Sequence, residues 1–282
     1  MSSAQQATVE AAALAALMCA DPAEKAIAVR ALLADWQSGA LVRAGRAVVD
    51  GPVCSPGRPP RPELVSPDAV PRRAPGSREG HAALLHAVAH IEFNAINLAL
   101  DCVARFWDQP DEFVTDWLGV AVEEAYHFGL VCGRLAADGY AYGDFPAHNG
   151  LWDMCCDTAG DFVARMALVP RLLEARGLDA TPPMIAKLIK GGDADTVAVL
   201  QIILRDEIGH VAIGDRWFRA GCAARGLQAE SEYRDLIVRF DAPWPKPPFN
   251  VPARLQAGFS QNELDRLANE RPAPYRTPRK PA

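Results

Sequence analysis

The sequence has 282 residues, half of them apolar, and a net charge of −6. A chain of this length can bury a substantial core, and it contains no apolar run long enough to cross a membrane, which indicates a soluble globular protein. The acidic balance argues against a strongly cationic surface that holds nucleic acid non-specifically.

The cellular compartment is predicted from the N-terminus and the cysteines. The apolar stretch 11–20 follows Glu10 and no basic residue, whereas a secretory signal begins with positive charge. The seven cysteines contain no Cys-x-x-Cys pair, so we expect reduced thiols in place of a disulfide or zinc framework. We therefore expect a cytoplasmic protein that is not bound to a membrane.

The first 80 residues divide into a helical extension (1–50) and a proline-rich linker (51–80). Helix formers fill 8–36 and are interrupted at Asp21-Pro22, which predicts two short helices. Eight prolines in the linker exclude a helix or a central strand, so it either wraps the surface or is partly mobile. Arginines between Arg58 and Arg73 permit a nucleic-acid arm, although such a run is more often a solvated linker.

The remaining chain is predicted to be an all-α four-helix bundle (81–225) followed by a C-terminal helix and irregular arm (226–282). Apolar spacing in the bundle is helical and strand-like alternation is nearly absent. The expected bundle helices cover about 81–108, 111–138, 150–176 and 194–224. The expected breaks are 108–110, 139–150, and 177–183 followed by a short apolar turn before Gly191-Gly192. In the arm we expect a short helix near 261–269 and a frayed basic tail.

A Glu-x-x-His motif occurs twice, at Glu124 to His127 and at Glu207 to His210. On a helix this spacing places the carboxylate and the imidazole on one face, about 5 to 6 Å apart. Each pair therefore suits one metal ion.

An internal repeat extends the two motifs. Glu92 precedes Glu124 by 32 positions, and Glu174 precedes Glu207 by 33. Each half thus predicts an antiparallel helix pair whose first helix offers one glutamate and whose second offers Glu-x-x-His. Four carboxylates and two imidazoles are the ligand set of carboxylate-bridged di-iron and di-manganese bundles. The predicted metal ligands are Glu92, Glu124, His127, Glu174, Glu207 and His210.

The surroundings of these residues favour burial over the alternative, a set of surface salt bridges. Glu92, Glu124 and Glu207 each lie in an apolar helical stripe. The third helix differs, because Pro170 lies one turn before Glu174 and removes a backbone hydrogen bond. We expect a kink there, either a plain structural one or one that opens the helix toward a bound small molecule.

Other polar residues are assigned less specific roles. His86 and His90 are expected to be core or outer-shell histidines, since His90 lies about 160° around the helix from Glu92. Tyr126 beside His127 favours packing over redox chemistry. The acidic neighbours are interpreted as surface charges (Glu123, Asp206) or as candidates for orienting the imidazoles (Asp101, Asp157, Asp161).

A family resemblance follows from three runs. They are His90-Ile91-Glu92, Leu173-Glu174-Ala175-Arg176-Gly177-Leu178-Asp179 and Arg205-Asp206-Glu207-Ile208-Gly209-His210. These runs resemble a bacterial domain-of-unknown-function family of ferritin-like di-iron carboxylate proteins, over about residues 80–260. The resemblance implies a four-helix bundle with a di-metal centre, distantly related to rubrerythrin and tRNA hydroxylase. It also implies bridging roles for Glu124 and Glu207 and terminal roles for Glu92 and Glu174. Fold analogy does not select a reaction.

The leading functional hypothesis is an O₂-dependent oxidoreductase that uses two iron ions, with manganese as the alternative metal. Its small-molecule substrate and electron donor are not readable from the sequence, and a homodimer remains open. One alternative is a non-catalytic metal-binding, storage or scaffold bundle, although long proline-rich arms fit poorly with a compact storage cage. A second alternative is an RNA (tRNA) hydroxylase, which the acidic balance disfavours.

Overall fold

The computed structural model describes residues 7–53, 55–74 and 76–270. Over these residues the chain is helical, and its only strand-like pairings are isolated bridges between Thr8 and Val42 and between Leu64 and Ala147. The predicted all-α class is confirmed. The chain divides into two compact units, Met1–Ala159 and Gly160–Ala282, so the boundary falls inside the segment predicted to form the bundle.

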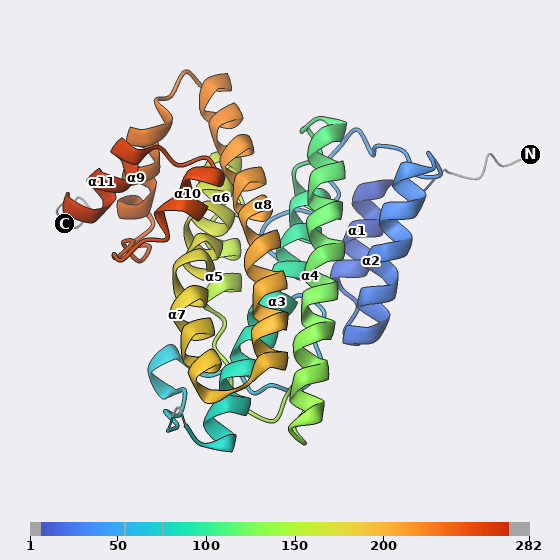
Figure 1. Ribbon diagram of the computed structural model, residues 1–282. Helices are drawn as coiled ribbons and strands as arrows, with labels where there is room; N and C mark the ends of the chain where they lie inside the picture. The colour runs from blue at the N-terminus through green and yellow to red at the C-terminus, as the bar shows by residue number, and fades with distance from the viewer. Residues whose placement is uncertain (1–6, 54, 75, 271–282) are drawn as a thin grey trace, which may run out of the picture. The chain divides into compact units, whose positions relative to one another are not determined.

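The first unit begins with two short helices, as predicted: α1 (Val9–Leu17) and α2 (Pro22–Gln37). The boundary at Asp21 has a local cause, because the Asp21 side chain accepts hydrogen bonds from the amides of Ala23 and Glu24 and caps α2. Pro22 occupies the first helical turn, where its missing N–H costs nothing. α1 packs on α3 and α2 packs on α4 (Figure 1).

A long antiparallel helix pair forms the core of the first unit: α3 (Arg78–Arg105) and α4 (Asp111–Ala137) (Figure 1). Ser77 caps α3 by accepting from the Gly80 amide, and a short turn ending at Pro110 leads into α4. Both helices lie close to their predicted bounds. Among the described residues, α3 alone is long and apolar enough to cross a membrane, but 72 % of its apolar window is buried in the structure, as in a core helix.

The proline-rich segment wraps the first unit. The Gly57 amide donates to the Leu17 carbonyl at the end of α1, and a pair of backbone hydrogen bonds joins 63–65 to Ala147. The segment has one short 3₁₀ turn, η1 (Pro67–Ala69). Two of its arginines make contacts within the chain, since Arg58 donates to Asn149 and Arg73 pairs with Glu79. Cys54 and Pro75 lie outside the described residues.

The predicted third helix, 150–176, is wrong as one continuous element. The first unit ends with α5 (Gly150–Asp157), and the second unit begins with α6 (Phe162–Leu168). The chain breaks between them because Asp161 starts a new helix, accepting hydrogen bonds from the amides of Val163 and Ala164.

A π-helical segment, η2 (Val169–Glu174), continues α6 and passes directly into α7 (Ala175–Gly191). The irregularity expected near Pro170 is therefore confirmed. The break predicted at 177–183 is wrong, because α7 runs through Pro182 and Pro183. Pro182 cannot donate to the Leu178 carbonyl, and the Asn250 side chain donates to that carbonyl instead, at 3.1 Å.

The second unit is completed by one long helix and three short ones. They are α8 (Ala194–Ala224), α9 (Ala229–Arg239), α10 (Val251–Gln256) and α11 (Gln261–Asn269). α11 matches the short helix predicted near 261–269, and α8 matches the predicted fourth helix. Within this unit α6, η2 and α7 pack along α8. The basic tail beyond 270 lies outside the described residues.

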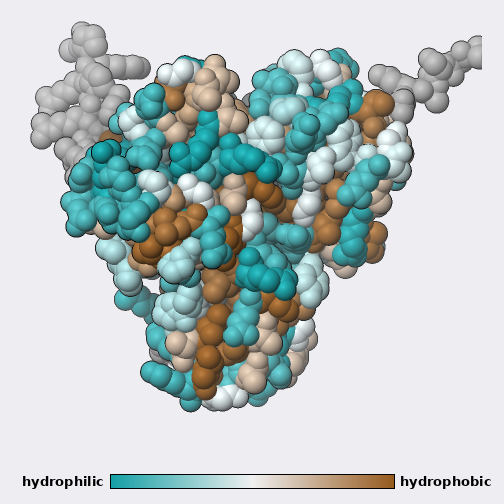
Figure 2. Space-filling view, turned by 45° about the horizontal axis from the view of Figure 1, so that its top comes forward, coloured by the Kyte–Doolittle hydropathy of each residue, from teal (hydrophilic) through white to brown (hydrophobic). Residues whose placement is uncertain are grey.

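The surface is mostly hydrophilic on the face drawn in Figure 2, with hydrophobic residues reaching it in places between polar ones. Ile91, Tyr126 and Ile189 are each more than half exposed. Tyr126, expected to pack, is thus only half covered, and its ring centre lies 6.2 Å from that of His127.

Candidate metal centre

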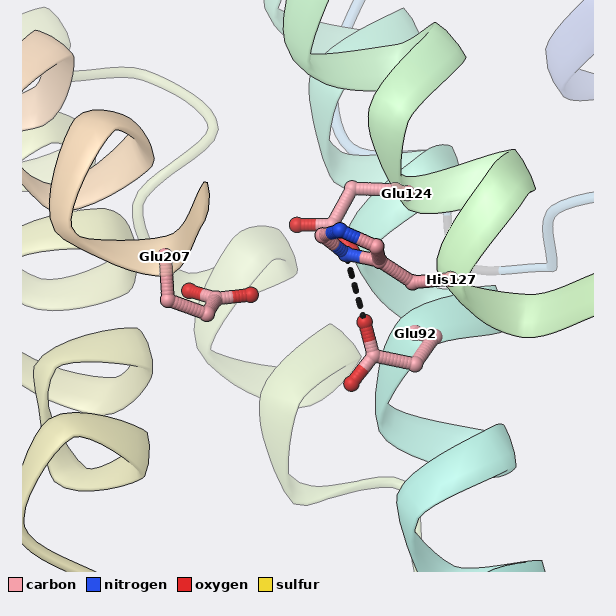
Figure 3. A group of neighbouring side chains, drawn as sticks. All are labelled: Glu92, Glu124, His127 and Glu207. Carbon is pink, nitrogen blue, oxygen red and sulfur yellow. Dashed lines mark ion pairs between the residues drawn. The ribbon is translucent and has the colours of Figure 1, made fainter. Parts of the chain in front are cut away.

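The first group of predicted ligands comes from the α3–α4 pair. Glu92 lies on α3, and Glu124 and His127 lie one turn apart on α4. His127 Nδ1 is 3.4 Å from Glu92 Oε2 and 3.5 Å from Glu124 Oε2. Figure 3 shows the three side chains converging, with a dashed line for the His127–Glu92 ion pair. The sequence spacing therefore places three ligand groups together within the first unit.

These three side chains are removed from solvent. Glu124 and His127 are fully buried and Glu92 is 4 % exposed. Burial alone would lower the pKa of His127, but hydrogen bonding and charge from Glu124 and Glu92 outweigh it and raise the pKa to about 11. A buried cluster of this kind concentrates negative charge, which a cation in the same place would offset.

The second group lies in the second unit. Glu174 is the last residue of η2, and Glu207 and His210 lie one turn apart on α8. His210 Nδ1 is 3.6 Å from Glu207 Oε1, which repeats the His127–Glu124 arrangement. All three are buried, Glu207 being 9 % exposed. Figure 3 also draws the carboxylate of Glu207. The place of Glu174 in a ligand set stays a prediction.

The packing of η2 against α8 has a steric basis. A Cβ atom added at Gly214 would lie 2.6 Å from Pro170 Cβ, so only glycine lets the proline approach α8 this closely. Gly214 follows His210 by one helical turn. The segment that carries Glu174 is thereby packed against the helix that carries Glu207 and His210.

The histidines assigned to the core or outer shell are buried on α3 and make hydrogen bonds away from the ligand groups. His90 Nδ1 is 2.9 Å from the Tyr142 hydroxyl, and His86 Nε2 accepts from the Gly143 amide. Burial lowers the pKa of both histidines to about 4, so both are neutral near pH 7. Both side chains are thus buried and hydrogen-bonded, as expected for core or outer-shell histidines.

The other acidic candidates are placed as follows. Asp101 is buried and forms a two-point ion pair with Arg105, and Asp161 caps α6 and pairs with Arg225. Glu123 is exposed and Asp206 pairs with Arg205, as expected for helix-surface charges. Asp157 is the last residue of α5.

Sequence reasoning missed the buried cations, among them Lys25 and Arg171. Lys25 is fully buried and donates to the carbonyls of Leu17 and Gly57 and to the Asn97 side chain. Arg171, three residues before Glu174, is fully buried and pairs with Asp215 and Glu263. The local sequence pattern does not indicate these partners. Those of Arg171, for example, lie 44 and 92 positions away in the chain.

The donor chemistry of the two groups fits hard or borderline divalent cations. Each group offers carboxylate oxygens and one imidazole, which suit iron or manganese. None of the predicted ligands is a cysteine, whose thiolate favours softer metals. The ligand atoms of Glu92, Glu124 and His127 lie within 4.8 Å of one another, so this buried group could hold a metal ion.

The fold and the site together define an all-helical protein with buried carboxylate–histidine groups. The chain belongs to the family described as "Protein of unknown function (DUF455)", which matches residues 18–265. It is also 52 % identical, over 214 residues, to an uncharacterized protein of Haemophilus influenzae, covering 73 % of this chain and 74 % of that protein. No solved structure matches the chain.

Proposed function

We propose that the protein is a ferritin-like di-metal carboxylate protein in which both buried groups bind one pair of ions. The observation that carries the proposal is the repeated arrangement of glutamate and histidine: His127 lies 3.5 Å from Glu124, and His210 lies 3.6 Å from Glu207. The chain positions of the third member, Glu92 or Glu174, extend the repeat. In a ferritin-like bundle two helix pairs supply this ligand set.

The six side chains have distinct roles in this proposal. Glu124 and Glu207 would be shared by the two ions, Glu92 and Glu174 would each bind one ion, and His127 and His210 would each supply an imidazole. Two iron ions held by these residues would supply redox chemistry toward O₂. We infer an O₂-dependent oxidoreductase that acts on a small-molecule substrate with a separate electron donor.

The chain holds the predicted ligands in position and surrounds them with apolar side chains. Glu92, Glu124 and His127 are carried on long helices, which hold their backbones in a fixed register. Val120, Ala121 and Phe128, on α4, are buried and surround the Glu124–His127 turn with apolar side chains. A low-polarity environment strengthens the attraction between carboxylates and cations and limits the access of water.

The test is metal analysis of the full-length protein expressed in iron-replete medium, with optical spectra recorded after anaerobic reduction and again after exposure to air. We expect two irons per chain and a near-ultraviolet charge-transfer band that appears with oxygen. Wild-type protein with one ion or none per chain would contradict the di-metal proposal.

The spectra and RNA retention separate the alternative functions. A non-catalytic metal-binding protein would hold two ions without continuing turnover, whereas an oxidoreductase would couple continuing O₂ consumption to a reductant supplied in excess. An RNA hydroxylase would retain RNA in a salt-dependent manner during purification. Repeated turnover without RNA retention supports the proposed small-molecule oxidoreductase.

A further inference from the structure

Arg171 is a buried cation held by two carboxylates of the second unit. Its Nε donates to Asp215 Oδ1 at 2.6 Å, and its Nη2 donates to both carboxylate oxygens of Glu263, at 2.6 and 2.7 Å. Asp215 lies on α8 and Glu263 lies on α11. Arg171 thus ties the π-helical segment η2 both to the long helix and to the C-terminal arm, defined here as residues 241–270.

Aromatic rings enclose the same guanidinium group. Its central carbon lies 4.1 Å from the centre of the Tyr233 ring and 4.2 Å from that of Phe259, with Phe218 at 5.2 Å. The faces of aromatic rings attract a cation, most strongly when it is removed from water. The position of Arg171 is therefore defined by contacts on its faces as well as at its edge.

A second arginine of the C-terminal arm anchors the chain just after Glu174. Arg254 donates to the Ala175 carbonyl at 3.3 Å and to Asp179 Oδ2 at 2.6 Å. Its guanidinium carbon lies 4.9 Å from the Phe259 ring centre, so Phe259 contacts both arginines. Glu174 consequently lies between two anchor points, three residues after Arg171 and one before Ala175.

The backbone of η2, the segment between these anchors, is poorly suited to stabilise its own conformation. A π-helix is a rare form that is frequently found at functional sites, and Pro170 cannot donate a backbone hydrogen bond. External contacts must therefore determine where the Glu174 carboxylate is held. Asp215 extends the same network toward α8, because it also accepts from Arg219 Nε at 2.8 Å and follows Glu207 by eight residues and His210 by five.

We propose that Arg171, Asp215, Glu263 and Arg254 are positioning residues through which the C-terminal arm holds Glu174 in place to bind metal. This inference rests on the proposed function. Since binding free energies are reciprocal, an arm that improves metal binding must itself be held more firmly when metal is bound. A purely structural network would lack this coupling, because it would stabilise the fold equally with and without metal.

The first test compares Glu263→Gln with Asp265→Asn in the full-length protein. Both variants neutralise one carboxylate on α11, but Glu263 is buried against Arg171 and Asp265 is exposed. In Mn²⁺ titrations we expect Glu263→Gln to bind one of the two ions at least about 10-fold more weakly, as is typical when an outer-shell partner is lost. Asp265→Asn should match the wild type.

The second test needs no metal-loaded enzyme. In metal-free protein, amide hydrogen exchange within 169–174 should be faster in Glu263→Gln than in Asp265→Asn, while exchange in the middle of α8 stays the same in both. If Glu263→Gln does not fold, Glu263→Asp, which keeps the charge but shortens the side chain, takes its place in both tests.

The third test uses wild-type protein and measures the reciprocal effect. Mn²⁺ should slow trypsin cleavage after arginines of the arm, such as Arg254, and should do so less in Glu174→Gln. The positioning role of the C-terminal arm is refuted if the wild type binds two Mn²⁺ ions and folded Glu263→Gln binds them equally well. It is also refuted if Mn²⁺ does not change the rate at which trypsin cleaves the arm of the wild type. A wild-type protein that binds no metal would overturn both the proposed function and the positioning role of the arm.

Discussion

His127 Nδ1 lies 3.4 Å from Oε2 of Glu92, a residue 35 positions earlier on the other helix of the α3–α4 pair. Glu124 lies equally close on the same helix as His127, at 3.5 Å. An imidazole between two carboxylates, all buried, can form an internal ion pair or share a cation with them. Substitution of the predicted ligands separates these two cases.

Glu124→Gln is expected to weaken the binding of at least one metal ion by more than about 100-fold, because it replaces an anionic ligand by a neutral amide of the same shape. Helicity should be nearly unchanged. Glu123→Gln is the matched control, since Glu123 is the adjacent glutamate and is exposed. Isothermal titration with Mn²⁺ and far-ultraviolet circular dichroism measure the two properties. Equal metal affinities in the two variants would exclude Glu124 as a ligand.

Metal removal is expected to lower the melting temperature of the wild-type protein. A ligand present at 100 times its Kd stabilises the folded state by about 2.7 kcal/mol, which corresponds to several degrees in a chain of this size. Differential scanning calorimetry with Mn²⁺ or with a chelator measures the shift. Glu124→Gln should show a smaller shift than Glu123→Gln, and equal shifts would indicate that the stabilising ion binds elsewhere.

Gly214→Ala is expected to destabilise the second unit. The new Cβ would lie 2.6 Å from Pro170 Cβ and 2.7 Å from Pro170 Cγ, so η2 must move away from α8, and overpacking of this kind costs about 1–3 kcal/mol. Urea unfolding followed by circular dichroism measures the loss. Gly209→Ala, on the same helix, meets nothing within 4 Å and should instead be neutral or stabilising by up to about 1 kcal/mol.

Gly214→Ala also tests the proposed site, because displacement of η2 would move Glu174. We expect it to lower Mn²⁺ affinity, whereas Gly209→Ala should leave the affinity unchanged. A Gly214→Ala protein that loses stability but keeps full metal affinity would show that Glu174 does not depend on the packing of Pro170.

The stability of the first unit is expected to rise with pH above neutrality because of Lys25. Burial lowers the pKa of Lys25 from 10.5 to about 7. Between these two values the unfolded chain binds more protons than the folded one, so the free energy of unfolding increases with pH, by at most about 1.4 kcal/mol per pH unit. Below about pH 7 both states are protonated and the full cost of burying the charge is present.

Lys25→Met removes this contribution. Urea unfolding at pH 7, 8 and 9 should give a free energy of unfolding that rises less steeply in Lys25→Met than in the wild type. Lys187→Met serves as the control, because Lys187 is exposed and the chemical change is the same. Parallel pH profiles for the wild type and Lys25→Met would mean that the pKa of Lys25 is not lowered in the folded state.

Most of the correct predictions came from the helical spacing of residues close together in the sequence. The spacing of Glu124 and His127 fixes their common helix face, and the apolar positions around them indicate burial, so this pair and its repeat at Glu207 and His210 could be located without coordinates. The caps at Asp21 and Asp193 are likewise local, because each side chain accepts from an amide two or three residues later.

One error arose because a distant segment overrides a local signal. Pro182 and Pro183 predict a break, but α7 continues because Asn250, 72 positions from Leu178, donates to the carbonyl that Pro182 leaves without its helical partner. The single third helix failed for a more local reason, since the capping role of Asp161 competes with helix continuation and periodicity does not show which prevails.

The helical class, the two matched glutamate–histidine groups and their burial could be predicted without coordinates, because these features depend on residue type and on a period of 3.6 residues. The pairing of Arg171 with Asp215 and Glu263, 44 and 92 positions away, could be seen only in the folded chain. A buried cation needs anionic partners in space, and any carboxylate that folding brings within reach can supply them.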